Sequence, residues 1–481
     1  MDLRPAIFVV GLLLATLAVV MCIPAVVDFI FGHPDWKVFA TAAATTMFIG
    51  VTMALTSRTQ NAKLTIRHAF LITTASWIAL TLFASLPFVF SELNMGFTDA
   101  FFEAMSGITT TGSTVIVGLD EAPPGILLWR ALLQWLGGIG IIVMGIAVLP
   151  MLQVGGMQLF HMESSDRSDK AMPRTAQIAT AIAAIYLGLT FLWVVFYWLA
   201  GMSGFDAVAH GMATIATGGF STHDSSMAHF NSATIDYIAA LGMVIGALPF
   251  ILYLRTMQGN FRAIIRDSQV QWFITFVAGV IVITFSWLMI DVGEPPLIAM
   301  RMATFNIISV ITGTGFVTAD YGLWGSFSPV VFFFIMFIGG CAGSTTCGIK
   351  VFRFQVLYAA ARTQIKHLML PHGVFIPYFD KRPISEEIII SVLSFFFVWF
   401  LTFALLALSL SFLGLDFLTA FSSAATSIAN VGPALGPIAG PSGHFASFPD
   451  AAKWLMAIGM LLGRLELFTV IVMLTATFWR Q

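Results

Sequence analysis

Charged side chains are scarce in this sequence. Asp, Glu, Lys and Arg together make up 10% of the 481 residues, whereas 58% are hydrophobic. Soluble globular domains carry about 25% charged residues. The apolar residues are gathered in long runs near or above the roughly 20 residues that a helix needs to cross a bilayer. The composition therefore excludes an ordinary soluble domain and predicts a membrane protein with many spans.

Cysteine and the sequence signatures of catalysis are also lacking. The three cysteines, Cys22, Cys341 and Cys347, lie in apolar segments without the spacing of a disulfide framework or of a CxxC metal site. No Walker A pattern occurs, which argues against ATP-driven pumping by this chain. No paired acid, metal cluster or nucleophile–base pair is evident in the apolar runs. We therefore expect no enzyme activity, no bound organic cofactor and no nucleic-acid partner.

The apolar runs and the basic residues predict the membrane topology. The expected spans cover residues 5–31, 37–57, 68–91, 125–152, 175–201, 233–256, 270–291, 328–360, 386–414 and 451–479. The first run is too long for a signal-peptide core and shows no clear cleavage site, so we expect it to be retained. Most Lys and Arg residues lie on one side of these spans, and positive charge marks the cytoplasmic side. Both termini are therefore expected in the cytoplasm.

A short glycine motif recurs in the four long connections on the outer side. Its copies are Thr110-Thr111-Gly112, Ala216-Thr217-Gly218, Ile311-Thr312-Gly313 and Asn430-Val431-Gly432. An apolar stretch precedes each copy, and its length of about 12 residues corresponds to a helix of about 18 Å, which is half of a bilayer. We interpret each stretch as a half-helix that enters the membrane and returns as an extended loop. Such irregular backbone is tolerated at membrane depth only where it is buried in protein or lines water.

The four copies divide most of the chain into pseudo-repeats. Each repeat contains a span, a half-helix, a loop and a second span, and the four are expected to surround one pore in an all-α polytopic membrane protein. The expected segments are 1–58 for two additional N-terminal spans, 59–152 for repeat 1, 153–258 for repeat 2, 259–362 for repeat 3 with a broken second span, and 363–481 for repeat 4.

The twelve motif residues are the predicted K⁺ ligands of a selectivity filter. A dehydrated K⁺ ion needs oxygen ligands, which rings of backbone carbonyls supply. Backbone that turns successive carbonyls inward can require a positive φ, which glycine adopts freely. Half-helices also aim their partly negative C-terminal ends at the axis, which favours a cation. The predicted filter glycines are Gly112, Gly218, Gly313 and Gly432.

The fourth copy differs most from the other three. It carries Val431 before its glycine and Pro433 after it, whereas the other copies keep a Thr-Gly pair. We therefore expect an asymmetric filter whose selectivity for K⁺ is less strict than that of four identical loops.

A second candidate feature is the small-residue segment at 339–348. Its sequence, Gly-Gly-Cys-Ala-Gly-Ser-Thr-Thr-Cys-Gly, makes a poor straight helix and interrupts the expected span after the third loop. A flexible loop below the filter is suited to gating, and the alternative is a close helix-packing surface. The predicted gate residues are Gly343, Ser344, Thr345, Thr346 and Lys350.

Arg464 is a charged residue in the middle of the last expected span. Charge inside a membrane is costly and indicates function, so we expect Arg464 to act with the gate as an electrostatic barrier to cations. The alternative is an ion pair with an acid in a neighbouring span. Glu466 lies only two residues on, and residues two apart do not share a helix face.

The longest cytoplasmic connection, near 361–385, is basic. It contains or adjoins Arg362, Lys366, Lys381 and Arg382. Such a segment suits a soluble partner or the anionic headgroups of membrane lipid.

With these motifs together, the chain resembles the Trk/Ktr/HKT superfamily of potassium transporters, and most closely its bacterial TrkH/TrkG branch. The resemblance covers residues 68–479 through the four loops, the 339–348 segment and Arg464, and the two extra N-terminal spans are similar to those of the TrkH type. It implies K⁺ uptake by a homodimer in the bacterial inner membrane, each subunit with its own pore. It also implies a cytoplasmic nucleotide-binding regulatory subunit. Glycine at Gly112 resembles the K⁺-selective members, because serine there is associated with Na⁺-selective plant relatives.

A secondary cation symporter with alternating access is the alternative function. Inverted repeats of broken helices are typical of such carriers. Here each repeat has two spans, so all four share one orientation, and this favours a pore with approximate four-fold symmetry.

Overall fold

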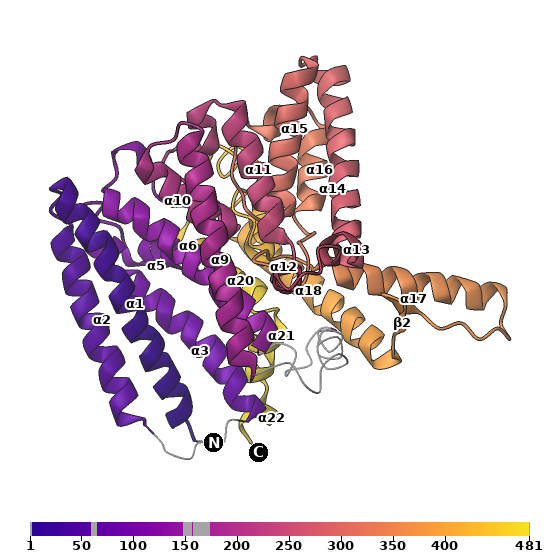
Figure 1. The fold of residues 1–481 in the computed structure, drawn as a ribbon, viewed down its shortest axis with the longest axis horizontal. Helices are drawn as coiled ribbons and strands as arrows, with labels where there is room; N and C mark the ends of the chain where they lie inside the picture. The colour runs from indigo at the N-terminus through magenta and orange to yellow at the C-terminus, as the bar shows by residue number, and fades with distance from the viewer. Residues whose placement is uncertain (1, 59–64, 148–155, 157–173, 481) are drawn as a thin grey trace.

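Helices dominate the computed structural model, which describes residues 2–58, 65–147, 156 and 174–480 (Figure 1). Within these residues, seven helices are long and apolar enough to cross a membrane, or up to nine if each of two bent pairs counts as one span. The predicted all-α polytopic fold is therefore confirmed.

Two N-terminal helices, α1 (Arg4–Phe31) and α2 (Trp36–Thr56), form an antiparallel pair at one side of the molecule (Figure 1). They cross where two glycines meet. A Cβ atom added to Gly11 would lie 2.7 Å from the Gly50 carbonyl oxygen, and one added to Gly50 would lie 2.8 Å from that of Gly11. Small residues allow such close backbone contact in membranes. Asp28 near the end of α1 accepts a 2.6 Å hydrogen bond from the Gly125 amide, which fixes the pair to the first repeat.

Four short helices end inside the protein, as the half-helix prediction requires. They are α5 (Phe97–Ile108), α10 (Gly204–Ile215), α15 (Pro296–Ile311) and α19 (Phe417–Ala429). Polar side chains close their outer ends in two cases: Ser203 accepts from the Asp206 amide at 3.1 Å, and Asp416 accepts from the Thr419 amide at 3.1 Å. Each half-helix then leads into a loop without regular structure.

Other helices flank each half-helix. Before the half-helices lie α3 (Ile66–Ala84) with α4 (Leu86–Phe90), α9 (Arg174–Leu199), α14 (Ser268–Trp287) with the π-helix η3 (Leu288–Val292), and α18 (Glu386–Phe412). After them lie α6 (Pro124–Ala147), α11 (Ala233–Ala247) with α12 (Phe250–Met257), α16 (Phe327–Ile335) with α17 (Val351–Met369), and α20 (Asp450–Arg464) with α21 (Phe468–Ile471). Short elements complete the chain: η1 (Leu119–Glu121), η2 (Ser226–Phe230), α13 (Ala263–Arg266), η4 (Tyr321–Leu323), η5 (Val472–Leu474) and α22 (Ala476–Trp479).

The second span is broken in three repeats, not only in the third. The chain bends by 92° between α11 and α12, and by 105° between α20 and the helical turns that follow it. The predicted spans 233–256 and 451–479 are therefore each sharply bent. Pro249 ends the first helix because it cannot continue the hydrogen-bond ladder, and the left-handed backbone of Glu466 and Leu467 ends the second. In repeat 3 the helix is also interrupted, because α16 ends at Ile335 and α17 begins at Val351.

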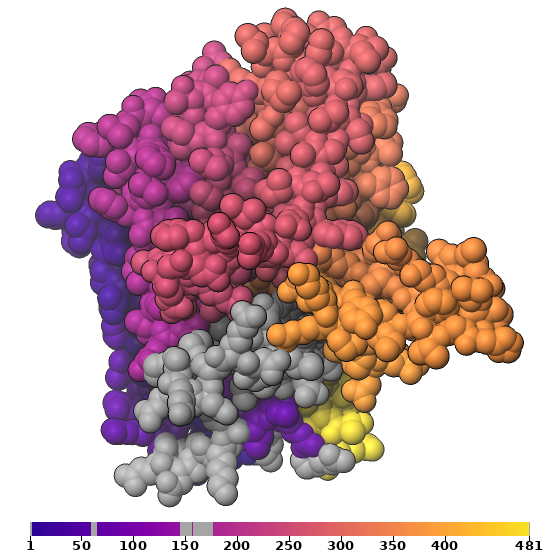
Figure 2. Space-filling view, turned by 45° about the vertical axis from the view of Figure 1, so that its right-hand side comes forward, coloured from indigo at the N-terminus to yellow at the C-terminus, as the bar shows by residue number. Residues whose placement is uncertain are grey.

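The two ends of the chain meet on one side of the molecule (Figure 1). His68 Nε2 lies 2.7 Å from the Asp2 carbonyl oxygen, and Phe70 of the same helix packs against Phe478. Helix α17 projects away from the body with a small hairpin, which pairs β1 (Tyr378–Phe379) with β2 (Arg382–Pro383). Figure 2 shows this projection as a separate lobe of the surface.

Candidate ion pore

The four half-helices end in the same backbone conformation. After each helix, one residue adopts a left-handed φ: 53° at Thr110, 49° at Thr217, 67° at Gly313 and 52° at Asn430. Left-handed residues are common helix ends. These four left-handed residues are therefore equivalent positions, from which the loops can be aligned without reference to the Thr-Gly pairs.

A glycine with positive φ follows two positions later in every loop. The values are 88° at Gly112, 79° at Gly219, 82° at Gly315 and 107° at Gly432. These glycines differ from the predicted filter glycines in the second and third loops. Gly218 is not among the residues with positive φ, and Gly313 is equivalent to Thr110 rather than to Gly112. The reason is that the helix end, and not the dipeptide, determines where the backbone must turn. We call the sixteen-residue set 109–112, 216–219, 312–315 and 429–432 the loop ring.

The loop ring closes on itself. A Cβ atom added to Gly432 would lie 2.8 Å from the Thr111 carbonyl oxygen. The other three glycines approach the carbonyl of the next loop more closely still. The facing pairs are Gly112 with Gly218, Gly219 with Thr314, Gly315 with Val431, and Gly432 with Thr111. Each loop thus contacts the next in the order 1-2-3-4-1, and the carbonyls involved occupy equivalent positions.

The four glycines that face the next loop differ in how exposed they are. Gly112, Gly219 and Gly315 are partly exposed, whereas Gly432 is buried. Ser113 Oγ donates a 2.7 Å hydrogen bond to the Gly432 carbonyl, and the Asn430 amide donates to Thr111 Oγ1 at 2.8 Å. The fourth loop therefore differs in its contacts as well as in its sequence.

Gln134 on α6 supports the second loop, and its role was missed in the sequence. Its Nε2 donates to the Gly218 carbonyl at 2.5 Å, and its Oε1 accepts from the Phe220 amide at 3.0 Å. Because the side chain is fully buried, these two bonds fix the backbone on both sides of Gly219.

A buried ion pair between Glu103 and Arg130 joins the first two loops and was also missed. Arg130 Nε lies 2.8 Å from Glu103 Oε1, and the two side chains are 1% and 0% exposed. Arg130 also donates to the Ser221 carbonyl at 2.7 Å, and Glu103 accepts from the Val115 amide at 2.9 Å. Arg130 lies near the start of the predicted span 125–152. The available signal was its place among apolar residues, since intramembrane charges are paired.

Breaking this pair is expected to destabilise the protein. Glu103→Gln would leave Arg130 charged, buried and unpaired, which costs on the order of 3–5 kcal/mol. The melting temperature of the purified protein in detergent should fall clearly. Glu92→Gln is the matched control, because Glu92 is 59% exposed beside His33, and such surface changes stay within about 0.5 kcal/mol. Equal melting temperatures for the two variants would contradict the role given to the pair.

The 339–348 segment lies directly against the loop ring. Thr345 Oγ1 lies 3.0 Å from Thr217 Oγ1, and Cys347 Sγ lies 4.0 Å from Thr110 Oγ1. The segment is held by the broken second helix of repeat 2, since the Gly343 carbonyl accepts from the Phe250 amide at 2.9 Å. Of the predicted gate residues, Ser344, Thr345 and Thr346 are buried, and Gly343 is left-handed with φ of 76°.

Arg464, at the end of α20, contacts the same segment. Its guanidinium donates to the Thr345 carbonyl at 3.1 Å and to the Gly137 carbonyl on α6 at 2.9 Å. The side chain is 1% exposed, and no ion pair of Arg464 occurs within the described residues. Glu466 instead pairs with Arg353 on α17. The alternative of an ion pair with a neighbouring acid is thus unsupported for Arg464.

Lys350 also faces this region. Its Nζ donates to the Thr346 carbonyl and lies 3.2 Å from Thr346 Oγ1. A cavity of about 30 Å³ lies between Gly343, Lys350, Arg464 and Glu466. Such a space is large enough for water. The predicted gate residues other than Thr345 therefore lie together around a small cavity.

Known proteins match this chain over its whole length. A family model named TrkH and described as a cation transport protein matches residues 36–480. The Trk system potassium uptake protein TrkI of Halomonas elongata is 46% identical over 478 residues, which cover 99% of this chain and 97% of that protein. TrkH of Escherichia coli K12 is 38% identical over 487 residues that cover both chains fully. The crystal structure of the potassium transporter TrkH from Vibrio parahaemolyticus matches with a TM-score of 0.93 and 38% identity over all of both chains.

Proposed function

The chain belongs to the TrkH family of cation transport proteins, and from this premise we propose that it takes up K⁺ through the loop ring across the bacterial cytoplasmic membrane. The observation that carries the proposal is the closure of four glycine loops, each facing the carbonyl of the next. Stacked carbonyls replace the water shell of K⁺. The K⁺ ion is the transported substrate, and the proposal needs no organic cofactor.

The segment 339–348 is proposed as the gate. It lies against Thr110 and Thr217, and in this proposal it obstructs the ion path below the loop ring. Two buried cations, Lys350 and Arg464, adjoin it. An ion leaving the loop ring would meet their positive charge, so opening requires the segment and these side chains to move.

A disulfide across this contact is expected to lock the pore shut. In a Cys341→Ser, Cys347→Ser background, Thr217→Cys with Thr345→Cys replaces two hydroxyls that lie 3.0 Å apart, close enough for a bond of about 2.05 Å after small adjustment. Oxidation should lower K⁺ flux in proteoliposomes on the order of tenfold, and a reductant should restore it. The single Thr345→Cys variant in the same background is the control. Full flux with a disulfide verified by mass spectrometry would contradict a gating role.

The cytoplasmic side is proposed to carry both termini and α17. Basic residues concentrate there, in line with the positive-inside rule. The projecting α17 and its hairpin would offer a surface to membrane lipid or to a cytoplasmic nucleotide-binding regulatory subunit. We also propose a homodimer with one pore in each subunit, which chemical cross-linking in native membranes would test.

A secondary cation symporter remains the competing function, and the helices bent by 92° and 105° are the observation that favours it, since broken helices are typical of such carriers. Flux through the reconstituted full-length protein decides between the two. Collective domain motions take microseconds to milliseconds, so a flux above roughly 10⁶ ions per second per pore excludes a rocking carrier. The same liposomes compare K⁺ with Na⁺. Absence of any K⁺ flux would overturn the proposed function.

A further inference from the structure

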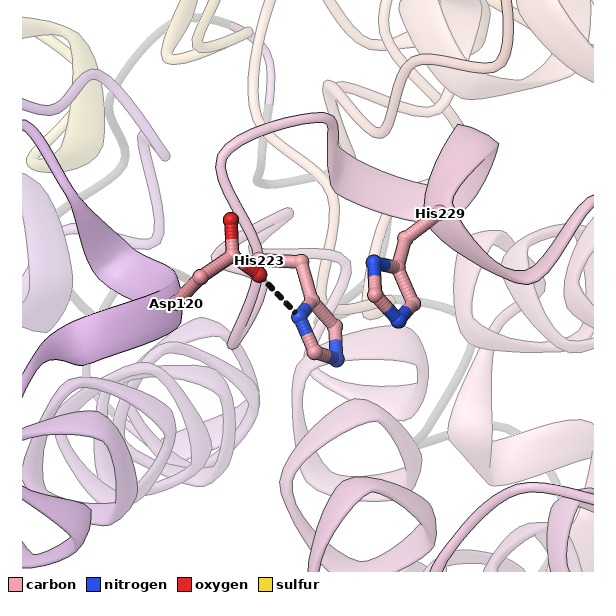
Figure 3. A group of neighbouring side chains, drawn as sticks. All are labelled: Asp120, His223 and His229. Atoms are coloured by element: carbon pink, nitrogen blue, oxygen red, sulfur yellow. Dashed lines mark hydrogen bonds and ion pairs between the residues drawn. The ribbon is translucent and has the colours of Figure 1, made fainter.

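Three potential metal ligands meet on the outer loops, away from the loop ring. Asp120 lies in η1, His223 lies in the connection after the second loop, and His229 lies in η2 (Figure 3). One ligand atom from each lies within 4.8 Å of the others. We propose that Asp120, His223 and His229 bind a transition-metal cation of the Zn²⁺ class, and that this ion restrains the outer loops of repeats 1 and 2 and lowers cation flux.

The donor set fits this class of ion. Two imidazoles and one carboxylate are ligands that Zn²⁺ prefers, with water completing the tetrahedron. Mg²⁺ and Ca²⁺ take oxygen ligands instead. His223 Nδ1 lies 2.5 Å from Asp120 Oδ1, so these two ligand atoms already face each other.

The geometry shows which ligands must move. The His223 and His229 rings stack with centroids 3.5 Å apart and 3° between their planes. Parallel rings aim their lone pairs in parallel directions, so one ring must tilt before both bind the same ion. Ligand bonds of about 2.0–2.2 Å place tetrahedral donors roughly 3.4 Å apart, so the cluster must also contract.

Asp120 and His229, which flank His223, have room to make this adjustment. Asp120 and His229 are exposed, whereas the His223 side chain is only 17% exposed and its backbone amide donates to Ser221 Oγ at 3.1 Å. Figure 3 shows His223 between the other two side chains. We therefore assign His223 as the fixed ligand on which Asp120 and His229 close.

The cluster lies close to the loop ring along the chain and is connected to it through hydrogen bonds. His223 follows Gly219 by four residues, and the Ser221 carbonyl between them accepts from Arg130. The neighbouring Asp224 accepts from the Gly118 and Leu119 amides at 3.1 and 3.0 Å, which holds η1 against the second loop. A bound divalent cation would fix these loops together and repel incoming cations at the outer mouth.

Binding is tested with Zn²⁺ alone on the purified full-length protein by isothermal titration calorimetry. We expect one site in the unmodified chain and at least tenfold weaker binding in His229→Ala and Asp120→Asn. Both are exposed positions, so these variants should fold. His33→Ala is the matched control, since His33 is another outer histidine that lies beside Glu92 and outside the cluster. Undiminished Zn²⁺ binding in His229→Ala and Asp120→Asn would overturn the site.

Flux is tested separately in proteoliposomes, with Zn²⁺ added and each variant normalised to its own flux without metal. We expect Zn²⁺ to inhibit the unmodified chain and His33→Ala at micromolar concentration, and His229→Ala to need at least tenfold more. Mg²⁺ at the same concentration should not inhibit. If Zn²⁺ binds at the site without changing the flux, the proposal that it restrains the outer loops and lowers cation flux is wrong. Because calorimetry needs no flux, failure of the metal site is distinguishable from failure of the proposed K⁺ uptake.

Discussion

Gly315→Ala is expected to lower K⁺ flux on the order of tenfold or more and to weaken discrimination against Na⁺. Gly315 has a φ of 82°, and a Cβ atom there would overlap the Val431 carbonyl oxygen. That carbonyl must shift, and a change of about 1.4 kcal/mol in the ion's barrier is already tenfold in rate. The measurement is K⁺ and Na⁺ flux through the reconstituted full-length protein.

The matched control is Gly313→Asn in the same loop. Gly313 occupies the turn where the fourth loop already has Asn430, and the first two loops have threonine, all with left-handed φ. Asparagine tolerates this conformation better than most residues. A Cβ atom at Gly313 would lie 3.2 Å from its nearest neighbour, the Asn430 carbonyl oxygen, so we expect flux within a few-fold of the unmodified chain. Equal loss in both variants, or loss only in Gly313→Asn, would refute the register of the loop ring.

Arg464→Gln is expected to raise K⁺ flux in the absence of any regulatory subunit. The guanidinium is buried and binds the Thr345 carbonyl of the proposed gate. Two like unit charges about 8 Å apart repel by about 2 kcal/mol at an effective dielectric constant of about 20. Removing the charge should therefore increase flux on the order of tenfold, and single-channel recording would measure it.

Arg464→Lys separates charge from shape. Lysine keeps the positive charge but loses the fork that reaches both Thr345 and Gly137. Low flux in Arg464→Lys with high flux in Arg464→Gln assigns the effect to charge. High flux in both assigns it to the lost hydrogen bonds that hold the segment. Unchanged or lower flux in Arg464→Gln would contradict the barrier.

The membrane class, the half-helices and the broken span after the third loop could be predicted from the sequence. The signals are local in the sequence: long apolar runs, a half-length stretch before each glycine motif, and the small-residue run at 339–348. They are informative because backbone groups without hydrogen-bond partners are excluded from lipid, which leaves few structures that such segments can adopt. The resemblance to the family could also be found from the sequence, because it depends on the same motifs.

Partners across repeats could not be predicted in this way. Glu103 and Arg130 are 27 residues apart in the sequence, and only the packing of the helices buries them together. Gln134 and the Asp120, His223 and His229 cluster carried no spacing signal. Each of these contacts depends on how separate repeats meet, which no short stretch of sequence encodes.

The sequence by itself determined that four glycine loops exist and roughly where they lie. Only the tertiary structure decided which glycines are equivalent. The Thr-Gly pairs predicted Gly218 and Gly313, whereas the glycines that face the carbonyl of the next loop are Gly219 and Gly315. The physical reason is that the end of each half-helix sets the first left-handed turn, and the carbonyl of the next loop leaves no room for a side chain two residues later. A positive φ and a close approach are properties of the assembled backbone, so a repeated dipeptide could indicate the loop but not its register.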